Sequence, residues 1–146
     1  MDRVYLLDHN VVVRIGTKRA MSEFVHDHCR APAEVAYEGR DARYTEALRA
    51  IEYLVSARVL RKLVNVMATV QPGRFELIDL YKNQGNADPL LVATVLAARD
   101  EEAATLFANE WVIATEDKAV RELAEHFAIP VIGAPELMDL IDETNA

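Results

Sequence analysis

The chain has 146 residues, of which 51% are apolar and 27% charged, a composition that is typical of a globular domain and excludes a disordered or low-complexity protein. A single cysteine excludes an internal disulfide, and no apolar run reaches the length of a membrane span, so we expect one soluble, cytoplasmic domain over residues 1–146. The net charge of −8 repels phosphate backbones, so a nucleic-acid partner has to be met by local cations.

The N-terminal part of the chain predicts a strand followed by helices. Residues 4–7 are a short β-prone apolar run that ends at Asp8, as a buried strand does at the carboxyl edge of a sheet. Helical apolar spacing over residues 11–30, with a break at Gly16, predicts one or two short helices. A long amphipathic helix is predicted over residues 41–60, with these side chains facing inward: Ala42, Leu48, Ile51, Leu54 and Val55.

The middle of the chain predicts a second strand and a capped helix. Residues 63–70 are rich in β-branched side chains and are followed by Pro72 and Gly73, which indicates a strand. A helix over residues 75–83 then leads to the next helix, 88–98. That helix begins with Asp88 and Pro89, an N-cap acceptor followed by a residue with a fixed φ.

The C-terminal part predicts strand, helix, strand and helix over residues 111–115, 117–127, 129–132 and 136–141. This alternation predicts an α/β fold in which helices cover both faces of a central parallel sheet of four to five strands. Ligands of such folds bind beyond the carboxyl ends of the strands. Asp8 and the acidic turn after Thr115 should both lie at this edge.

Four acidic residues are candidates for a metal site at this edge. Mg²⁺ and Mn²⁺ take oxygen ligands, often one or two carboxylates together with substrate phosphates. The candidate acids are Asp8, Glu34, Asp88 and Asp117. Each aspartate is also explained by capping the N-terminus of a helix or forming a turn, and the two roles are compatible.

Four segments resemble PIN-domain nucleases in order and spacing over nearly the whole chain. The segment VYLLDHNVV is similar to their opening strand and aspartate, ADPLLVATVLAA to their alanine-rich central helix, WVIATEDKAV to the strand and acid that follow, and AIPVIGAPEL to their closing strand.

The resemblance implies a three-layer αβα PIN-like fold and a Mg²⁺- or Mn²⁺-dependent endoribonuclease of the VapC toxin type. It carries the catalytic role to Asp8, Glu34, Asp88 and Asp117, with Glu38 as the rival of Glu34. Asp8, Asp88 and Asp117 would be metal ligands, and two residues would support them: Asn10 and Thr115. The family also implies an RNA substrate, an antitoxin partner and pairing as a homodimer.

Two positions depart from the family pattern. His9 stands where a small hydroxyl residue is common, and we expect it at the rim of the site. Ala119 stands where the family often has a further acid two residues after the last aspartate. Glu116 is the nearest alternative carboxylate, although its position before Asp117 predicts that it points elsewhere.

Cations near the acids are candidates for phosphate contacts. Arg14 and Lys18 follow the first motif with Arg19, and Arg40 follows Glu34 with Arg43; a solvated helix face explains them equally well. Trp111 opens an apolar strand and is expected in the core.

Two other functions compete with the nuclease. Ala119 favours a PIN-fold binding module that holds RNA or a protein without cutting. A phosphoryl-accepting receiver domain also has acids at strand ends, but it needs a late lysine on a different strand. Cys29 beside His28 does not indicate a catalytic dyad, because neighbours in sequence rarely form one.

Overall fold

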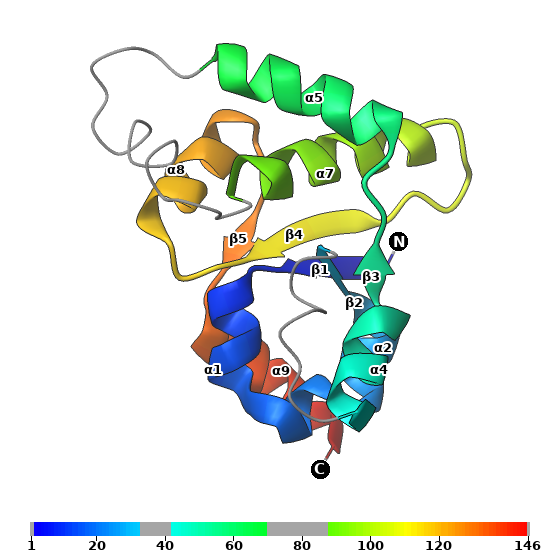
Figure 1. Ribbon diagram of the computed structural model, residues 1–146, viewed down its shortest axis with the longest axis vertical. Coiled ribbons are helices and arrows are strands. Elements are labelled where there is room, and N and C mark those ends of the chain that lie inside the picture. Colours follow the sequence, from blue (N-terminus) through cyan, green and yellow to red (C-terminus); the bar gives the residue numbers. More distant parts are fainter. Residues whose placement is uncertain (1, 33–41, 70–87, 146) are drawn as a thin grey trace.

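The central element is a five-stranded parallel sheet. A computed structural model describes residues 2–32, 42–69 and 88–145 of the chain (Figure 1). The strands are β1 (Arg3–Leu7), β2 (Cys29–Pro32), β3 (Glu52–Tyr53), β4 (Glu110–Ala114) and β5 (Val131–Ile132), in the spatial order β3-β2-β1-β4-β5. The helices of the described residues are α1 (His9–Ala20), α2 (Glu23–His28), α4 (Ala42–Ala50), α5 (Ala57–Ala68), α7 (Asp88–Glu102), α8 (Lys118–His126) and α9 (Ala134–Asn145).

The strand order reverses between β1 and β4, which lie side by side in the middle of the sheet. They pair from Arg3 opposite Glu110 to Leu7 opposite Ala114. From β1 the chain passes through α1 and α2 to β2 on one side, and from β4 it passes through α8 to β5 on the other. In doubly wound folds this reversal is the switch point where a crevice opens beyond the carboxyl ends of the strands.

Helices cover both faces of the sheet, so the molecule has three layers. Helices α1, α2, α4 and α9 lie on one face, and α5, α7 and α8 lie on the other (Figure 1). Neighbouring residues of β1 point to opposite faces, because Tyr5 and Leu7 pack with the first group and Leu6 with the second. The predicted αβα fold class with its parallel sheet is confirmed.

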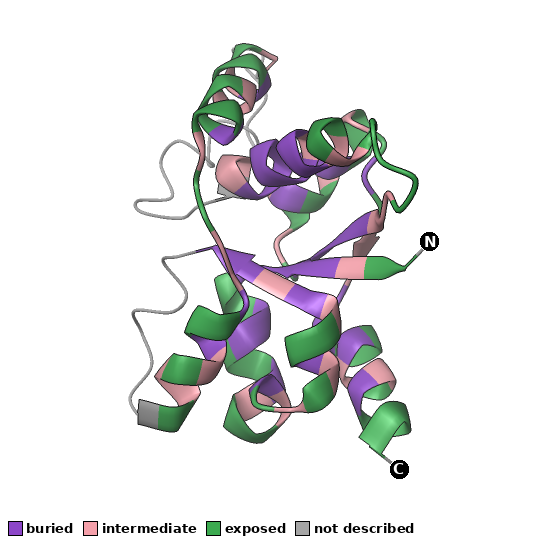
Figure 2. Ribbon diagram, turned by 90° about the vertical axis from the view of Figure 1, so that its right-hand side faces the viewer, coloured by how far each residue is buried: buried purple, intermediate pink, exposed green. Residues whose placement is uncertain are grey.

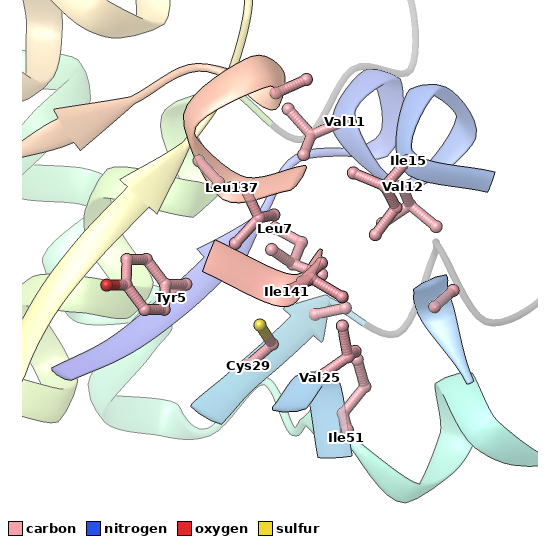
Figure 3. Packing of buried hydrophobic residues seen from close by; sticks show 14 of the residues in the cluster. Tyr5, Leu7, Val11, Val12, Ile15, Val25, Cys29, Ile51, Leu137 and Ile141 are labelled. Atoms are coloured by element: carbon pink, nitrogen blue, oxygen red, sulfur yellow. The ribbon is translucent and has the colours of Figure 1, made fainter. Parts of the chain in front are cut away.

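The first layer is an apolar cluster built between the sheet and α9. Leu137 and Ile141 lie one turn apart on α9 and face Leu7 of β1, while Val11 and Ile15 come from α1 (Figure 3). All of these side chains are at most 2% exposed. Their burial ties α1, which begins immediately after Asp8, to the sheet.

The second layer is centred on α7. This helix packs against both β4 and α5, and it also contacts α8. Five consecutive residues, 91–95, are buried, whereas most residues of α5 are half-buried or exposed (Figure 2). A helix that is apolar on all sides suits this central position.

The predicted helix over residues 41–60 is correct as far as Ala50, where α4 ends, but wrong as one continuous helix, because α5 begins only at Ala57. Glu52 and Tyr53 form β3, which pairs with Ala31 and Pro32 of β2. Leu54 is 72% exposed, so its predicted inward orientation is also wrong, and the same holds for Val55 at 44%. The pairing of β3 at the edge of the sheet therefore interrupts the helix that the apolar spacing predicted.

The predicted strand over residues 63–70 is wrong, because residues 63–68 belong to the helix α5 and Thr69 is its C-cap. The hydroxyl oxygen of Ser56 accepts a hydrogen bond from the Val59 amide (3.3 Å), which caps α5. Val59 and Val66 are buried in the layer that contains α7, and Leu63 packs against it. Tertiary burial at helical spacing overrides the β propensity of the valines.

The helical prediction over residues 11–30 is correct except at its end. The break at Gly16 is present, since its φ of 85° lies outside the helical region. Cys29 and Arg30, however, already belong to β2 and pair with β1. The helix predicted over residues 75–83 lies outside the described residues. None of the helices described is long and apolar enough to cross a membrane.

Candidate active site

Asp8 is the centre of the candidate site. It directly follows β1, caps α1 and is only 8% exposed. Its backbone amide donates to the Ala114 carbonyl oxygen (3.0 Å), which continues the pairing of β1 with β4 by one residue. The side chain consequently lies at the reversal of the strand order.

A buried hydroxyl joins the ends of the two central strands. Thr115, which is fully buried, donates from Oγ1 to Oδ2 of Asp8 (2.7 Å). The same Oγ1 accepts a hydrogen bond from the Asp117 amide (3.0 Å). One hydroxyl therefore fixes the Asp8 carboxylate relative to the turn that carries Asp117.

Asp117 caps the helix that follows this turn. Its Oδ1 accepts a hydrogen bond from the Ala119 amide (2.9 Å) at the start of α8. Asp8 caps in a similar way, with Oδ1 accepting from the His9 amide (2.7 Å). The structural roles considered for both aspartates are thus present. Each role uses one carboxylate oxygen.

The charge state of Asp8 is set by competing influences. Burial raises the pKa of its carboxyl, and the negative charge of Asp117 raises it further. The hydrogen bonds from Thr115 and His9 lower it. Within the described part of the chain, no lysine or arginine forms an ion pair with Asp8.

These two carboxylates fit a divalent cation by the chemistry of their donors. A buried carboxylate that is repelled by a second one is relieved by a positive ion bound between them. Each oxygen of Asp8 accepts one hydrogen bond and keeps a further lone pair. A Mg²⁺ or Mn²⁺ ion bound there would polarise a phosphoryl oxygen and acidify a water molecule.

The described residues hold only part of the predicted ligand set. Glu34 and its rival Glu38 lie outside them, and Asp88 is described as the first residue of α7 without its side chain. Over residues 2–32, 42–69 and 88–145, no three His, Cys, Asp or Glu side chains gather as a metal-binding group. The structure brings together Asp8, Thr115 and the Asp117 turn.

The other residues around the first motif are exposed. His9 lies at the rim as expected, and its positive charge, when present, lowers the pKa of Asp8. Asn10 is exposed at the start of α1 and shows no side-chain hydrogen bond to another described residue.

The predicted phosphate-binding cations are placed differently from one another. Arg14 forms an ion pair with Glu116 (2.8 Å), and Arg19 forms a double hydrogen bond with Asp142 (both 2.9 Å). Lys18 lies in the last turn of α1, away from Asp8, and its charge acts on Asp142. Arg40 lies outside the described residues.

Glu116, the alternative carboxylate, is hydrogen-bonded to residues of α1 and α9. Its Oε1 accepts hydrogen bonds from Arg14 and from the Ala134 amide (3.2 Å). Sequence reasoning missed this arrangement, because 102 positions separate Arg14 from Glu116 and no local pattern links them.

The structure contains no activated thiol among the described residues. Cys29 is buried in the first apolar layer (Figure 3), and burial raises its pKa to about 12. The ring of His28 packs against Phe24 (4.9 Å between centroids).

No protein-family model matches this sequence, and no curated protein matches it.

Proposed function

We propose that this chain is a divalent-metal-dependent endoribonuclease. The observation that carries the proposal is the Asp8 carboxylate, buried where the strand order reverses and held by Thr115 beside the Asp117 turn. The resemblance of four ordered segments to PIN-domain nucleases supports it.

The chain's own residues would orient the ions and the substrate. Asp8, Asp88 and Asp117 would bind Mg²⁺ or Mn²⁺, and Glu34 would be the further catalytic acid. Thr115 would keep the Asp8 carboxylate in place. No side-chain nucleophile is needed, because the attacking group is water. Because the net charge of −8 repels the phosphate backbone of RNA, bound metal cations would be needed to attract it to this edge of the sheet.

Substitution of Asp8 tests the proposal directly. We expect the wild-type protein to cleave RNA only with Mg²⁺ or Mn²⁺, and Asp8→Asn to abolish cleavage while the circular dichroism spectrum stays unchanged. Asp139→Asn, an exposed position of α9, is the matched control. Full metal-dependent activity of Asp8→Asn would contradict the proposal.

The biological role follows as the second part of the proposal. The resemblance to VapC proteins favours the toxin of a toxin–antitoxin pair, a cytoplasmic protein that is neutralised by an antitoxin and forms a homodimer. Expression of the chain alone should then arrest growth, and co-expression of the product of an adjacent small reading frame should restore it. Normal growth despite abundant wild-type protein would contradict this role.

A binding module without catalysis is favoured by one observation. Ala119 donates its amide to Asp117 but has no carboxylate, at the position where a further acid is common in the family. Calorimetric titration with Mn²⁺ distinguishes the two functions. A nuclease should show saturable binding of Mn²⁺, whereas a binding module that has lost a metal ligand should show none while it still binds RNA.

A further inference from the structure

Arg14 and Glu116 connect three segments at the carboxyl edge of the sheet. Arg14 lies on α1, Glu116 lies in the turn between β4 and α8, and the Ala134 amide at the start of α9 donates to the same Glu116 oxygen (3.2 Å). Gly133 permits the close approach, because a Cβ there would lie 3.1 Å from Oε2 of Glu116.

Glu116 is the residue between Thr115 and Asp117, which both take part in the candidate site. The hydroxyl of Thr115 and the amide of Asp117 are hydrogen-bonded to each other across Glu116 (3.0 Å). Whatever holds Glu116 also restrains this turn, since only the two flanking peptide units separate its neighbours.

The ion pair between Arg14 and Glu116 can restrain the turn, although both side chains are partly exposed. The side chain of Glu116 is 28% exposed and that of Arg14 is 56% exposed. An isolated pair of this kind stabilises a protein little, but it can still select one conformation of a short turn. The charge of Arg14 is moreover satisfied by Glu116, which leaves it poorly suited to a phosphate.

We propose that Arg14 is a positioning residue that acts through Glu116 to hold the Thr115–Asp117 turn in its metal-binding conformation, and that it does not contact the substrate phosphate. The inference rests on the proposed function for its consequence in catalysis. Its structural part, the restraint of the turn, stands independently of any activity.

Amide hydrogen exchange of the metal-free protein tests the structural part. The reporters are the amides of Asp117 and Ala119, whose acceptors are Thr115 and Asp117. We expect Arg14→Gln and Glu116→Gln to accelerate their exchange about two- to fivefold, as loss of an exposed ion pair allows. Arg14→Lys, which keeps the charge, should restore most of the protection.

Arg19→Gln is the matched control, because it breaks a comparable ion pair on the same helix. Its partner Asp142 lies at the far end of α9, so exchange at Asp117 and Ala119 should stay unchanged. Equal acceleration in Arg19→Gln, or none in Arg14→Gln, would overturn the proposal.

Kinetics and metal binding distinguish a positioning role from a phosphate contact. A positioning residue should weaken Mn²⁺ binding, measured calorimetrically, and lower kcat while KM for RNA changes little. A phosphate contact should instead raise KM and reduce the salt dependence of RNA binding by about one unit of slope, with exchange unchanged. The second pattern would overturn the proposal.

The exchange experiment keeps this inference separate from the proposed function. If the wild-type protein neither cleaves RNA nor binds Mn²⁺, the proposed function fails, whereas faster exchange in Arg14→Gln still supports the restraint of the turn. If cleavage occurs and exchange is unaffected, the nuclease stands and the positioning role fails.

Discussion

At the scale of single residues, Asp8 combines a cost in stability with the metal-binding role that we propose for it. Burial and the nearby charge of Asp117 raise the pKa of its carboxyl, so the folded protein binds a proton there more tightly than the unfolded chain does. Ionised Asp8 therefore destabilises the metal-free fold at neutral pH. Functional sites commonly carry such a cost.

We predict that Asp8→Asn stabilises the metal-free protein at pH 7. Below the ordinary aspartate pKa of about 3.9, Asp8 is protonated in both states and the difference in stability should largely disappear. The stabilisation of Asp8→Asn should thus appear as pH rises through the elevated pKa of the folded state. Urea unfolding across this pH range measures it.

The exposed control Asp139→Asn should change the free energy of unfolding by less than about 0.5 kcal/mol at either pH. A loss of stability in Asp8→Asn that grows as the pH rises would show that the hydrogen bonds of the carboxylate outweigh its burial.

A second residue with a local cost is Ala128, whose φ of 56° lies in the left-handed region. It ends α8 in a Schellman motif, in which the Ile129 amide donates to the Ala124 carbonyl oxygen (2.9 Å) and the Ala128 amide to that of Glu125 (3.0 Å). Glycine is the usual residue at this position, because it has no Cβ to clash.

We predict that Ala128→Gly stabilises the protein by about 0.5–1 kcal/mol, because relief of the Cβ strain exceeds the added entropy of the unfolded chain. The midpoint of urea unfolding should rise at constant slope. Ala124→Gly within the same helix should have the opposite sign, and a lower midpoint for Ala128→Gly would refute the strain argument.

At the scale of elements, the sequence predicted most of what lies near the site. The runs that became β1, β4, α7 and α8 carry clear apolar periods and capping residues, and Asp8 and Asp117 were located from them. The sequence failed where tertiary contacts decide. The valines of α5 favour a strand locally, and only burial against α7 makes them helical.

The interruption between α4 and α5 was also beyond local reasoning. Glu52 and Tyr53 become a strand because β2 offers Ala31 and Pro32 as partners. Likewise, the pairing of Arg14 with Glu116 depends on α1 and the β4–α8 turn meeting in space, which the spacing of residues along the chain does not encode.

The break within α1 gives a prediction for an element. Gly16 has φ 85° and ψ 166°, a conformation that side chains rarely adopt, while the space around it is open. Gly16→Ala should therefore destabilise the protein by about 1–3 kcal/mol through backbone strain alone. The midpoint of thermal unfolding, monitored by circular dichroism, measures the effect.

Thr17→Ala, the adjacent exposed position, serves as the control for Gly16→Ala and should change stability little. Should Gly16→Ala prove as stable as the wild type, α1 can straighten through this position, and the break is a preference of the glycine rather than a requirement of the fold.

At the scale of the whole molecule, one sheet separates two apolar layers and couples them. Leu6 and Leu7 are adjacent in β1 and face opposite layers, so neither layer can be lost while the strand stays fully packed. The unique tryptophan, Trp111, belongs to the layer of α7 and donates its indole N–H to Glu102 (2.8 Å).

We predict that Leu137→Ala, in the opposite layer, destabilises the protein by about 2–5 kcal/mol and shifts the unfolding transition seen by Trp111 fluorescence. Fluorescence and far-ultraviolet circular dichroism should give the same midpoint, as expected for a cooperative domain. Separate midpoints would show that the two layers unfold independently.

The brevity of the outer strands has a consequence for solubility. β3 and β5, at the two ends of the sheet, contain two residues each, and the longest pairing is enclosed at the centre. Long open strands serve as templates on which foreign strands add and aggregates grow. Among the described strands, the open edges are thus confined to these short margins, which present little surface for amyloid-like growth.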